Sequence, residues 1–589
     1  MLKKFFSGVL SSFVGAWLAL TVFSLSSVVL SFAILGAFSG DMSTSSVGVQ
    51  EKSVLHINMA NSFSEKTDIK GTILSLLGKS EMETTTLPTM LKALKVAKDN
   101  KNIEGVYIEC NGTTAGMATL KEIRDALVDF KESGKWIVAY GYDALAQSDY
   151  YIASVADSIY INPVGAVDIH GLSATLPFFK NVLDKIGVEY QVLRVGTFKS
   201  AVEPYIATEA SAANRTATEA YIKSLWSTIS NEIAESRSIS VDKLNDLADN
   251  MLFTKPVEYL LENKIVDGLC YKFDFIENLK AKTGISAADD LRLATPESVA
   301  ALEVSKTAID KVAVVYAVGG IDDGSEDGIV SKKLVEDIIA IAEDDAVKGV
   351  VLRVNSPGGS AFGSEQIWAA FEKVKKAGKP FAVSMGDYAA SGGYYISCGA
   401  DRIFAQPLTI TGSIGIFGLI PCYQELLNDK VGVNFTEIAT NKNGNLSTLK
   451  PMTPVQREAM QRMINAGYEL FTTRCAEGRD MQIDSLKAIA EGRVWDGSTA
   501  LKIGLVDEFG GLEDAIAYVV EEAKLGEYTV SEYPNVEDSF MRYIKEYVKV
   551  EVTDMFGIEP TGLLKYQSTI NEILERPYIQ CIMEPIEIK

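Results

Sequence analysis

Histidine is almost absent from this chain, because only His56 and His170 occur among its 589 residues. A triad of serine, histidine and aspartate needs an imidazole beside its nucleophile. Most of the chain therefore has no local histidine that could serve as the base for a serine. The known alternative for a serine nucleophile is a lysine base. The scarcity of histidine favours that chemistry without excluding the other.

Paired cysteines and an excess of basic residues are also missing. The six cysteines are scattered and form no Cys-x-x-Cys pair, which argues against a disulfide framework and a cysteine metal site. The chain has 56 basic and 78 acidic residues, for a formal net charge of −22 and a pI near 4.8. Because binding of nucleic acid needs a basic face, we exclude nucleic acid as a partner. We expect no metal and no cofactor.

Long apolar runs are missing too, with one exception at the N-terminus. No charged residue occurs from Phe5 to Phe38, and about 20 apolar residues cross a bilayer as a helix. The apolar region of a cleaved signal peptide is shorter, roughly 7–15 residues. We therefore expect an uncleaved anchor, with a cleaved signal as the alternative. Lys3 and Lys4 precede the run and Asp41 follows it, which places the body of the protein outside the cytoplasmic membrane.

The chain contains an internal repeat. Residues 103–163 align with residues 347–407 without a gap, at a constant offset of 244. The aligned identities include Gly105 with Gly349, Asn111 with Asn355, Tyr150-Tyr151-Ile152 with Tyr394-Tyr395-Ile396, and Pro163 with Pro407. One difference is chemical, because Ser391 of the later copy aligns with Gln147 of the earlier copy. A fold kept twice, with this serine in one copy only, suggests that Ser391 is catalytic.

Each copy alternates short apolar strands with helices. Strands are predicted at 53–57, 105–108, 136–140, 311–316, 349–354 and 380–384, and helices at about 88–98, at 331–343 and over much of 207–300. Such alternation is typical of β-α-β units and a mainly parallel sheet. We expect an α/β fold with four parts: an anchor and linker (1–52), a first repeat (53–300), a second repeat (301–530) and a helical tail (531–589).

Three segments carry the candidate chemistry, and the first is Asn355-Ser356-Pro357-Gly358-Gly359-Ser360. It directly follows an apolar strand. Paired glycines there allow backbone N–H groups to point into a cleft, as a developing oxyanion requires. An ordinary Pro-Gly turn is the alternative. The earlier copy, however, has lost the glycine pair together with the serine.

The second segment is Ala389-Ala390-Ser391-Gly392-Gly393, which is predicted to open a helix. The positive end of the helix dipole favours negative charge at such a serine, and its small neighbours leave room for a peptide. The alternative role for Ser391 is to cap the helix.

The third segment belongs to the extension of the first copy and reads Arg194-Val195-Gly196-Thr197-Phe198-Lys199-Ser200-Ala201-Val202-Glu203-Pro204-Tyr205. Lys199 can act as a general base only if its pKa falls towards neutrality, which burial between packed domains achieves. A solvated surface lysine is the alternative.

Together these segments resemble the long, two-repeat form of the bacterial signal peptide peptidase A family, membrane-anchored serine proteases of the S49 type. The resemblance extends over nearly the whole chain and is carried by the Lys-Ser-Ala-Val-Glu-Pro and Ala-Ser-Gly-Gly-Tyr motifs. It implies that Ser391 is the nucleophile and Lys199 the general base. It also implies an oxyanion hole formed by Gly359, with the N–H of Gly392 as a second candidate, and a hydrogen bond between Ser413 and the lysine amine.

Lys442 is a rival for the role of base. Short, single-repeat relatives carry the serine and the lysine in one repeat, with the lysine roughly fifty residues after the serine, and Lys442 lies near that spacing from Ser391. The flanking sequence of Lys199 fits the two-repeat family, whereas Asn441-Lys442-Asn443-Gly444-Asn445 reads as a polar loop. We therefore prefer Lys199.

The resemblance also implies a crotonase and Clp-protease class of fold and a bowl-shaped homo-oligomer, expected to be a tetramer. The implied activity is hydrolysis of cleaved signal peptides and similar apolar peptides by a serine and lysine dyad, on the periplasmic side of the membrane. Two alternatives stay open. One is a catalytically inert membrane scaffold, and the other is a crotonase-like enzyme acting on acyl-CoA thioesters.

Overall fold

The computed structural model describes residues 49–66, 84–303, 308–322, 328–535, 579–582 and 587–588. The expected membrane anchor, from Phe5 to Phe38, lies outside these residues. Among the helices that the structure describes, none combines the length and the hydropathy needed to cross a bilayer.

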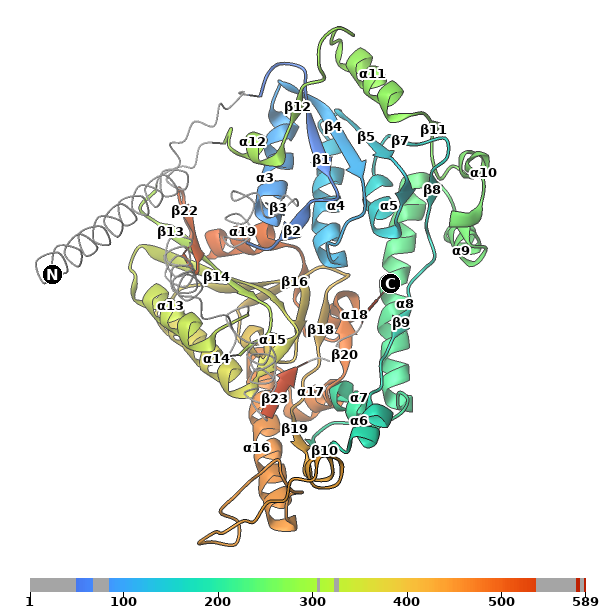
Figure 1. Cartoon of the computed structure of the whole chain (residues 1–589). Coiled ribbons are helices and arrows are strands. Elements are labelled where there is room, and N and C mark those ends of the chain that lie inside the picture. The colour runs from blue at the N-terminus through green and yellow to red at the C-terminus, as the bar shows by residue number, and fades with distance from the viewer. Residues whose placement is uncertain are drawn as a thin grey trace, which may run out of the picture. The chain divides into compact units, whose positions relative to one another are not determined.

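The first repeat is built on a six-stranded parallel sheet (Figure 1). Its strands follow the order β11-β7-β5-β4-β1-β12. They are β1 (Ser53–Asn58), β4 (Ile103–Cys110), β5 (Trp136–Gly141), β7 (Ser158–Ile161), β11 (Gly268–Leu269) and β12 (Leu293–Ala294). The connecting helices include α3 (Leu87–Asp99), α4 (Met117–Lys131) and α5 (Gln147–Ala153). β4 is buried along almost its whole length, as expected for a parallel strand with helices on both faces of its sheet.

The second repeat has the same arrangement in a larger sheet. Its strands follow the order β20-β18-β16-β14-β13-β22, and β17 and β21 extend it from β16. They are β13 (Lys311–Val318), β14 (Val347–Ser356), β16 (Phe381–Ala390), β17 (Arg402–Ala405), β18 (Ile410–Gly412), β20 (Val494–Asp496), β21 (Glu508–Phe509) and β22 (Thr529–Tyr533). Its helices include α13 (Ser331–Glu343), α14 (Ala361–Lys376), α15 (Gly392–Ser397) and α19 (Leu512–Glu522). The series β21-β17-β16-β14-β13-β22 repeats the order of the first sheet, which confirms the predicted α/β repeat.

The predicted helical segment lies between the two sheets in the sequence. Its helices include α8 (Ala212–Arg237), α9 (Val241–Asp249), α10 (Val257–Glu262), α11 (Lys272–Thr283) and α12 (Pro296–Ala300). In Figure 1 the long helix α8 extends from beside α5 towards β20. α8 contacts β20, and Ser224 Oγ donates to Asp496 Oδ1 at 2.7 Å. The helix therefore links the two repeats.

One strand is longer than predicted, because β16 continues past the expected end at residue 384 to Ala390. Its pairing with β14 shifts register, since Val354 lies opposite Met385 but Ser356 lies opposite Ala389. The extra residues form a bulge in β16. The glycine and the aspartate in that bulge interrupt the apolar pattern, which is why the sequence predicts an earlier end.

A small sheet joins segments of both repeats and of the C-terminal tail, in the order β10-β19-β23-β15. Its strands are β10 (Glu189–Arg194), β15 (Gly358–Ser360), β19 (Phe417–Cys422) and β23 (Ile579–Ile582). β10 belongs to the first repeat and pairs antiparallel with β19 of the second, from Glu189 opposite Cys422 to Arg194 opposite Phe417. This pairing carries the segment after Arg194 into the second repeat.

The helix predicted for residues 531–589 falls mostly outside the described residues. Where this tail is described it forms strands: the end of β22, then β23, then β24 (Glu587–Ile588). β23 pairs with β15 and β19, and β24 pairs with β9 (Ala174–Thr175) of the first repeat. Local sequence does not predict these strands, because all their partners are distant in the sequence.

A buried ion cluster lies between the repeats. Arg353 of β14 is fully buried, with Nε 2.8 Å from Glu65 Oε2 and Nη2 2.7 Å from Glu122 Oε1. Both glutamates belong to the first repeat. Burial raises the pKa of Glu122 to about 7, although the positive charge of Arg353 opposes this shift. Loss of one partner from such a cluster leaves a buried charge uncompensated.

We expect Glu122 to make the stability of the folded chain depend on pH. The folded chain binds the proton of the Glu122 carboxyl group more tightly than the unfolded chain does. Protonation of Glu122 therefore stabilises the fold, and this contribution to the free energy of unfolding is complete below the ordinary pKa of 4.5. It is lost as the pH rises through about 7. Glu122→Gln is neutral at every pH, so it should flatten the fall of the melting temperature between about pH 4.5 and about pH 7. Parallel melting profiles for the variant and the wild type would contradict this.

Candidate active site

Ser391 lies at a sharp turn between β16 and α15. Its backbone has φ 56° and ψ −112°, a conformation that is uncommon for residues other than glycine and that concentrates at functional sites. Its N–H donates to the carbonyl of Gly412 at 2.8 Å, which fixes the turn against β18. The side chain forms no capping hydrogen bond with α15. The predicted alternative role for this hydroxyl, a helix cap, is therefore wrong.

Lys199 comes from the other repeat and meets Ser391 directly. It follows β10 and precedes the short helix η1 (Ser200–Val202). Its Nζ lies 2.8 Å from Ser391 Oγ, 3.0 Å from Ser413 Oγ and 3.1 Å from the carbonyl oxygen of Ser413. Lys199 is 1% exposed and Ser391 is fully buried. The structure thus brings together three predicted site residues from two repeats, with three neutral acceptors at hydrogen-bonding distance from the amine.

Two glycines make room for the stem of Lys199. Gly492 has φ +79°, and a Cβ built there would lie 2.6 Å from Lys199 Cβ. A Cβ on Gly415 would lie 3.2 Å from Lys199 Cδ. Phe198 N donates to the carbonyl of Glu491 at 3.0 Å, which attaches the lysine segment to the same loop. Gly415 and Gly492 are not predicted as site residues, although Gly415 ends the Thr-Gly-Ser-Ile-Gly motif that contains Ser413.

The glycine-rich loop with the candidate oxyanion donors lies beside the serine turn. Gly358 N donates to Ser356 Oγ at 3.1 Å, and Ser360 N donates to the carbonyl of Ile321 at 2.7 Å. Gly359 has φ +157°, and a Cβ there would lie 2.2 Å from that carbonyl oxygen. β15, which contains Gly359, contacts α15, which begins at Gly392. The predicted donors are therefore on neighbouring elements around Ser391.

The other candidate bases lie elsewhere. Lys442 is exposed in the loop before α16 (Pro454–Gly478). His56 Nε2 lies 2.8 Å from Glu109 Oε2 on the first sheet, and His170 Nδ1 lies 3.0 Å from Asp168 Oδ1. Neither histidine belongs to the repeat that contains Ser391. The arrangement favours a lysine as the partner of the serine.

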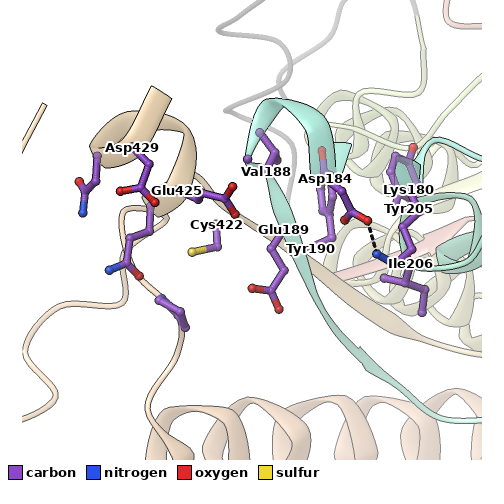
Figure 2. Close-up of a pocket in the computed structure, with 14 residues that line it drawn as sticks. Lys180, Asp184, Val188, Glu189, Tyr190, Tyr205, Ile206, Cys422, Glu425 and Asp429 are labelled. Carbon is purple, nitrogen blue, oxygen red and sulfur yellow. Dashed lines mark hydrogen bonds and ion pairs between the residues drawn. The ribbon is translucent and has the colours of Figure 1, made fainter. Parts of the chain in front are cut away.

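A cavity of about 670 Å³ lies away from this pair of residues. Figure 2 shows it between α6 (Lys180–Ile186) with β10 and the segment around Glu425. Tyr190, Tyr205 and Asp429 are among its lining residues, whereas Lys199, Ser391 and Ser413 are not. Beside the serine turn, β23 of the C-terminal tail lies between β15 and β19 and contacts α15.

The sequence is similar to a known peptidase family and to several of its members. The model of Peptidase family S49 matches residues 129–286 and 373–526. Protease 4 of Salmonella typhi is 35% identical over 502 residues, which cover 83% of this chain and 81% of the relative. Protease 4 of Haemophilus influenzae is 33% identical over 518 residues, with 85% and 83% covered. Putative signal peptide peptidase SppA of Enterococcus faecium is 42% identical over 200 residues, with 33% and 57% covered.

The two matched stretches fall in the two structural repeats. The first contains Lys199 and the second contains Ser391 and Ser413. The similarity to the two Protease 4 relatives extends over most of the chain. The chain therefore belongs to peptidase family S49 and is a serine peptidase.

Proposed function

We propose that Ser391 and Lys199 form a catalytic dyad that hydrolyses peptide bonds. Ser391 Oγ attacks the scissile carbonyl carbon while its proton passes to Lys199 Nζ. The C–N bond then breaks, the protonated lysine gives its proton to the leaving amine, and an acyl-enzyme remains. A water molecule then gives a proton to Lys199 Nζ and attacks the acyl carbon. The ester C–O bond breaks, and Lys199 returns the proton to Ser391 Oγ.

The observation that carries this proposal is the 2.8 Å distance between Lys199 Nζ and Ser391 Oγ at a buried site. Burial disfavours the charged form of an amine. A neutral amine has two N–H groups, which can donate to the hydroxyl and the carbonyl of Ser413. Its lone pair then faces the hydroxyl of Ser391 and can accept the proton.

The backbone N–H of Gly359 is the proposed main donor to the oxyanion, with the N–H of Gly392 as the second. Stabilisation of the oxyanion needs donors that are fixed before the reaction. The hydrogen bonds that tie Gly358 and Ser360 to Ser356 and Ile321 support this role, because they hold the loop on both sides of Gly359.

The proposed substrates are cleaved signal peptides and similar apolar peptides. The name of the Enterococcus faecium relative, a putative signal peptide peptidase, supports this class. We propose that Phe5–Phe38 anchors the chain in the cytoplasmic membrane, with the catalytic body on the periplasmic side, since Lys3 and Lys4 precede the run. An anchored enzyme remains close to peptides left in the bilayer.

A homo-oligomer, expected to be a tetramer, is also part of this proposal. Apolar side chains are exposed on and before α16, among them Phe435, Ile438, Val455 and Met463, and Ile438 is 95% exposed. Such patches are typical of protein contacts. They support burial of this face in an assembly.

The position of β23 indicates how a peptide substrate would bind. β23 runs antiparallel to β15, with Cys581 opposite Gly359, and antiparallel to β19, with Gln580 opposite Phe417. An extended peptide in the same position would form backbone hydrogen bonds with both strands. Its carbonyl groups would pass beside the glycine loop that precedes the serine turn.

Deletion of residues 579–589 should therefore increase activity on peptides. The tail competes with substrate for one groove, and a tethered competitor acts at a high effective concentration. We expect KM for a synthetic apolar peptide to fall several-fold while kcat stays the same, as measured by steady-state kinetics. A point variant that leaves the tail backbone intact, Gln580→Ala, serves as the control. An unchanged KM in the deletion protein would show that the tail does not compete measurably with the substrate.

The function is tested with the chain from residue 50 and a synthetic signal peptide. We expect cleavage within the apolar segment, detected by mass spectrometry, and labelling of Ser391 by a serine-directed fluorophosphonate. A folded protein that neither cleaves the peptide nor reacts with the label would contradict the proposal.

A further inference from the structure

The bulge in β16 is held open by a side chain from the neighbouring strand. Gly386, Asp387 and Tyr388 lie in β16 opposite Asn355 of β14. Asn355 Oδ1 accepts a hydrogen bond from Tyr388 N at 3.1 Å, and Thr409 Oγ1 donates to the carbonyl of Gly386 at 2.8 Å. These contacts satisfy backbone groups that the shifted ladder leaves without a strand partner.

The bulge directs Asp387 out of the second repeat and onto the first. Asp387 Oδ1 accepts from the backbone N–H groups of Ala118 and Thr119 at 2.8 and 3.1 Å, and Oδ2 accepts from Thr119 Oγ1 at 2.8 Å. These residues form the first turn of α4, whose own N-cap residue, Gly116, provides no side-chain cap. A Cβ on Gly116 would lie 2.2 Å from Asp387 Cγ. Asp387 of the second repeat thus provides the side-chain cap of α4 in the first repeat.

Asn355, which bonds to the bulge of β16, also makes a contact across the two repeats. Asn355 Nδ2 donates to Glu65 Oε1 at 3.0 Å, and Glu65 also pairs with Arg353. Glu65 follows β2 (Ser62–Ser64) of the first repeat and is 8% exposed. Asn355 is therefore fixed from both directions, by Glu65 of the first repeat and by the bulge of β16.

These contacts lie next to both halves of the proposed catalytic machinery. Asn355 immediately precedes Ser356, whose hydroxyl holds the N–H of Gly358. Tyr388 lies three residues before Ser391 in the strand that ends at the serine turn. A shift of Asn355 would therefore move the glycine loop and the nucleophile relative to each other.

The corresponding strand of the first repeat is divided in two. Asn111 aligns with Asn355, and β6 (Ala144–Leu145) pairs with β8 (Ala166–Val167) as the end of β16 pairs with β18. The strand equivalent to β16 is nevertheless divided, because β5 ends at Gly141 and β6 begins at Ala144. Gln147 occupies the position of the serine there. The continuous, bulged strand is found in the repeat that has a nucleophile to position.

We propose that Glu65, Asn355 and Asp387 are positioning residues, through which the first repeat holds the oxyanion loop and the serine turn in register. This inference rests on the proposed role of Ser391. The first repeat then has two functions in catalysis. It supplies Lys199, and it fixes the positions of the glycine loop and of the turn that contains Ser391. A misplacement of about 1 Å at such a site costs roughly 100-fold in rate.

The test compares Asp387→Asn with a matched control in the other repeat. Asp149 is also a buried carboxylate, and it accepts the backbone N–H groups of Gly112 and Thr113 at 2.7 and 3.1 Å, far in sequence from the serine turn. We expect Asp387→Asn to lower kcat and the rate of fluorophosphonate labelling by roughly 10- to 100-fold, with KM nearly unchanged. Asp149→Asn should lower the melting temperature but label at the wild-type rate.

A milder variant keeps the test decisive if Asp387→Asn fails to fold. Thr119→Val removes one hydrogen bond to Asp387 Oδ2 and keeps the shape of the side chain. We expect several-fold slower labelling with an almost unchanged melting temperature, which a purely structural role would not produce. Wild-type labelling rates in Asp387→Asn, or in Thr119→Val if only that variant folds, would overturn the inference and leave the proposed dyad intact. Failure of the wild-type protein to label would instead overturn the dyad itself.

Discussion

Replacement of Ser391 with alanine should lower kcat for peptide hydrolysis by roughly 10⁴- to 10⁶-fold, because no acyl-enzyme can form without its hydroxyl. The side chain is fully buried and does not cap α15, so its loss should change the melting temperature little. Steady-state kinetics and fluorophosphonate labelling measure the loss of activity. Thermal melting of the same samples shows whether the variant is folded.

Ser397→Ala is the matched control for this experiment. Ser397 is a fully buried serine in the same helix, and its hydroxyl donates to the carbonyl of Gly393 at 2.7 Å. We expect this variant to keep wild-type labelling and nearly wild-type kcat. Activity that survives in Ser391→Ala would show that another group is the nucleophile.

Replacement of Lys199 with methionine should have an effect of similar size. The methionine side chain can occupy the space that the stem of Lys199 takes beside Gly415 and Gly492. It cannot accept a proton, so Ser391 would keep its proton during the attack. We expect kcat to fall by roughly 10⁴-fold or more and labelling of Ser391 to become undetectable. Lys442→Met is the control, because Lys442 is exposed in a loop, and it should leave both rates unchanged.

Lys199→Arg separates the role of a base from that of a buried cation. Arginine carries a permanent positive charge and can donate to Ser413, but it is not deprotonated in proteins. A proton acceptor is therefore lost while a cation is retained. We expect the arginine variant to be as inactive as the methionine variant. Substantial activity in it, or loss of labelling in Lys442→Met with Lys199→Met still active, would contradict the proposed base.

Much of this architecture can be predicted from the sequence. The gapless alignment of residues 103–163 with 347–407 predicts two copies of one α/β fold, because apolar strands and helices recur at the same spacing. The strands β1, β4, β5, β13 and β14 and the helices α3 and α13 lie within a few residues of their predicted limits. The apolar residues of these elements recur at the spacing of a strand or a helix, so this local pattern is sufficient to identify them.

The candidate catalytic residues are also predicted from local motifs, since Ser391, Lys199 and Ser413 each belong to a short, distinctive segment. Other parts of the site have no such signal. Gly492 is an isolated glycine whose only distinction is its contact with Lys199. Asp387 and Glu65 are ordinary acidic residues in the sequence, and their partners lie 269 and 290 positions away.

The sequence by itself therefore determined the two repeats, the residue types available for catalysis and the scarcity of histidine. Only the tertiary structure decided that Lys199 meets Ser391, which lies 192 residues later. It also decided that β23 of the tail pairs with β15 and β19 and that the first repeat contacts the bulged strand. The physical reason is that periodicity records which face of each element is buried, whereas the pairing of β10 with β19 depends on how distant surfaces pack.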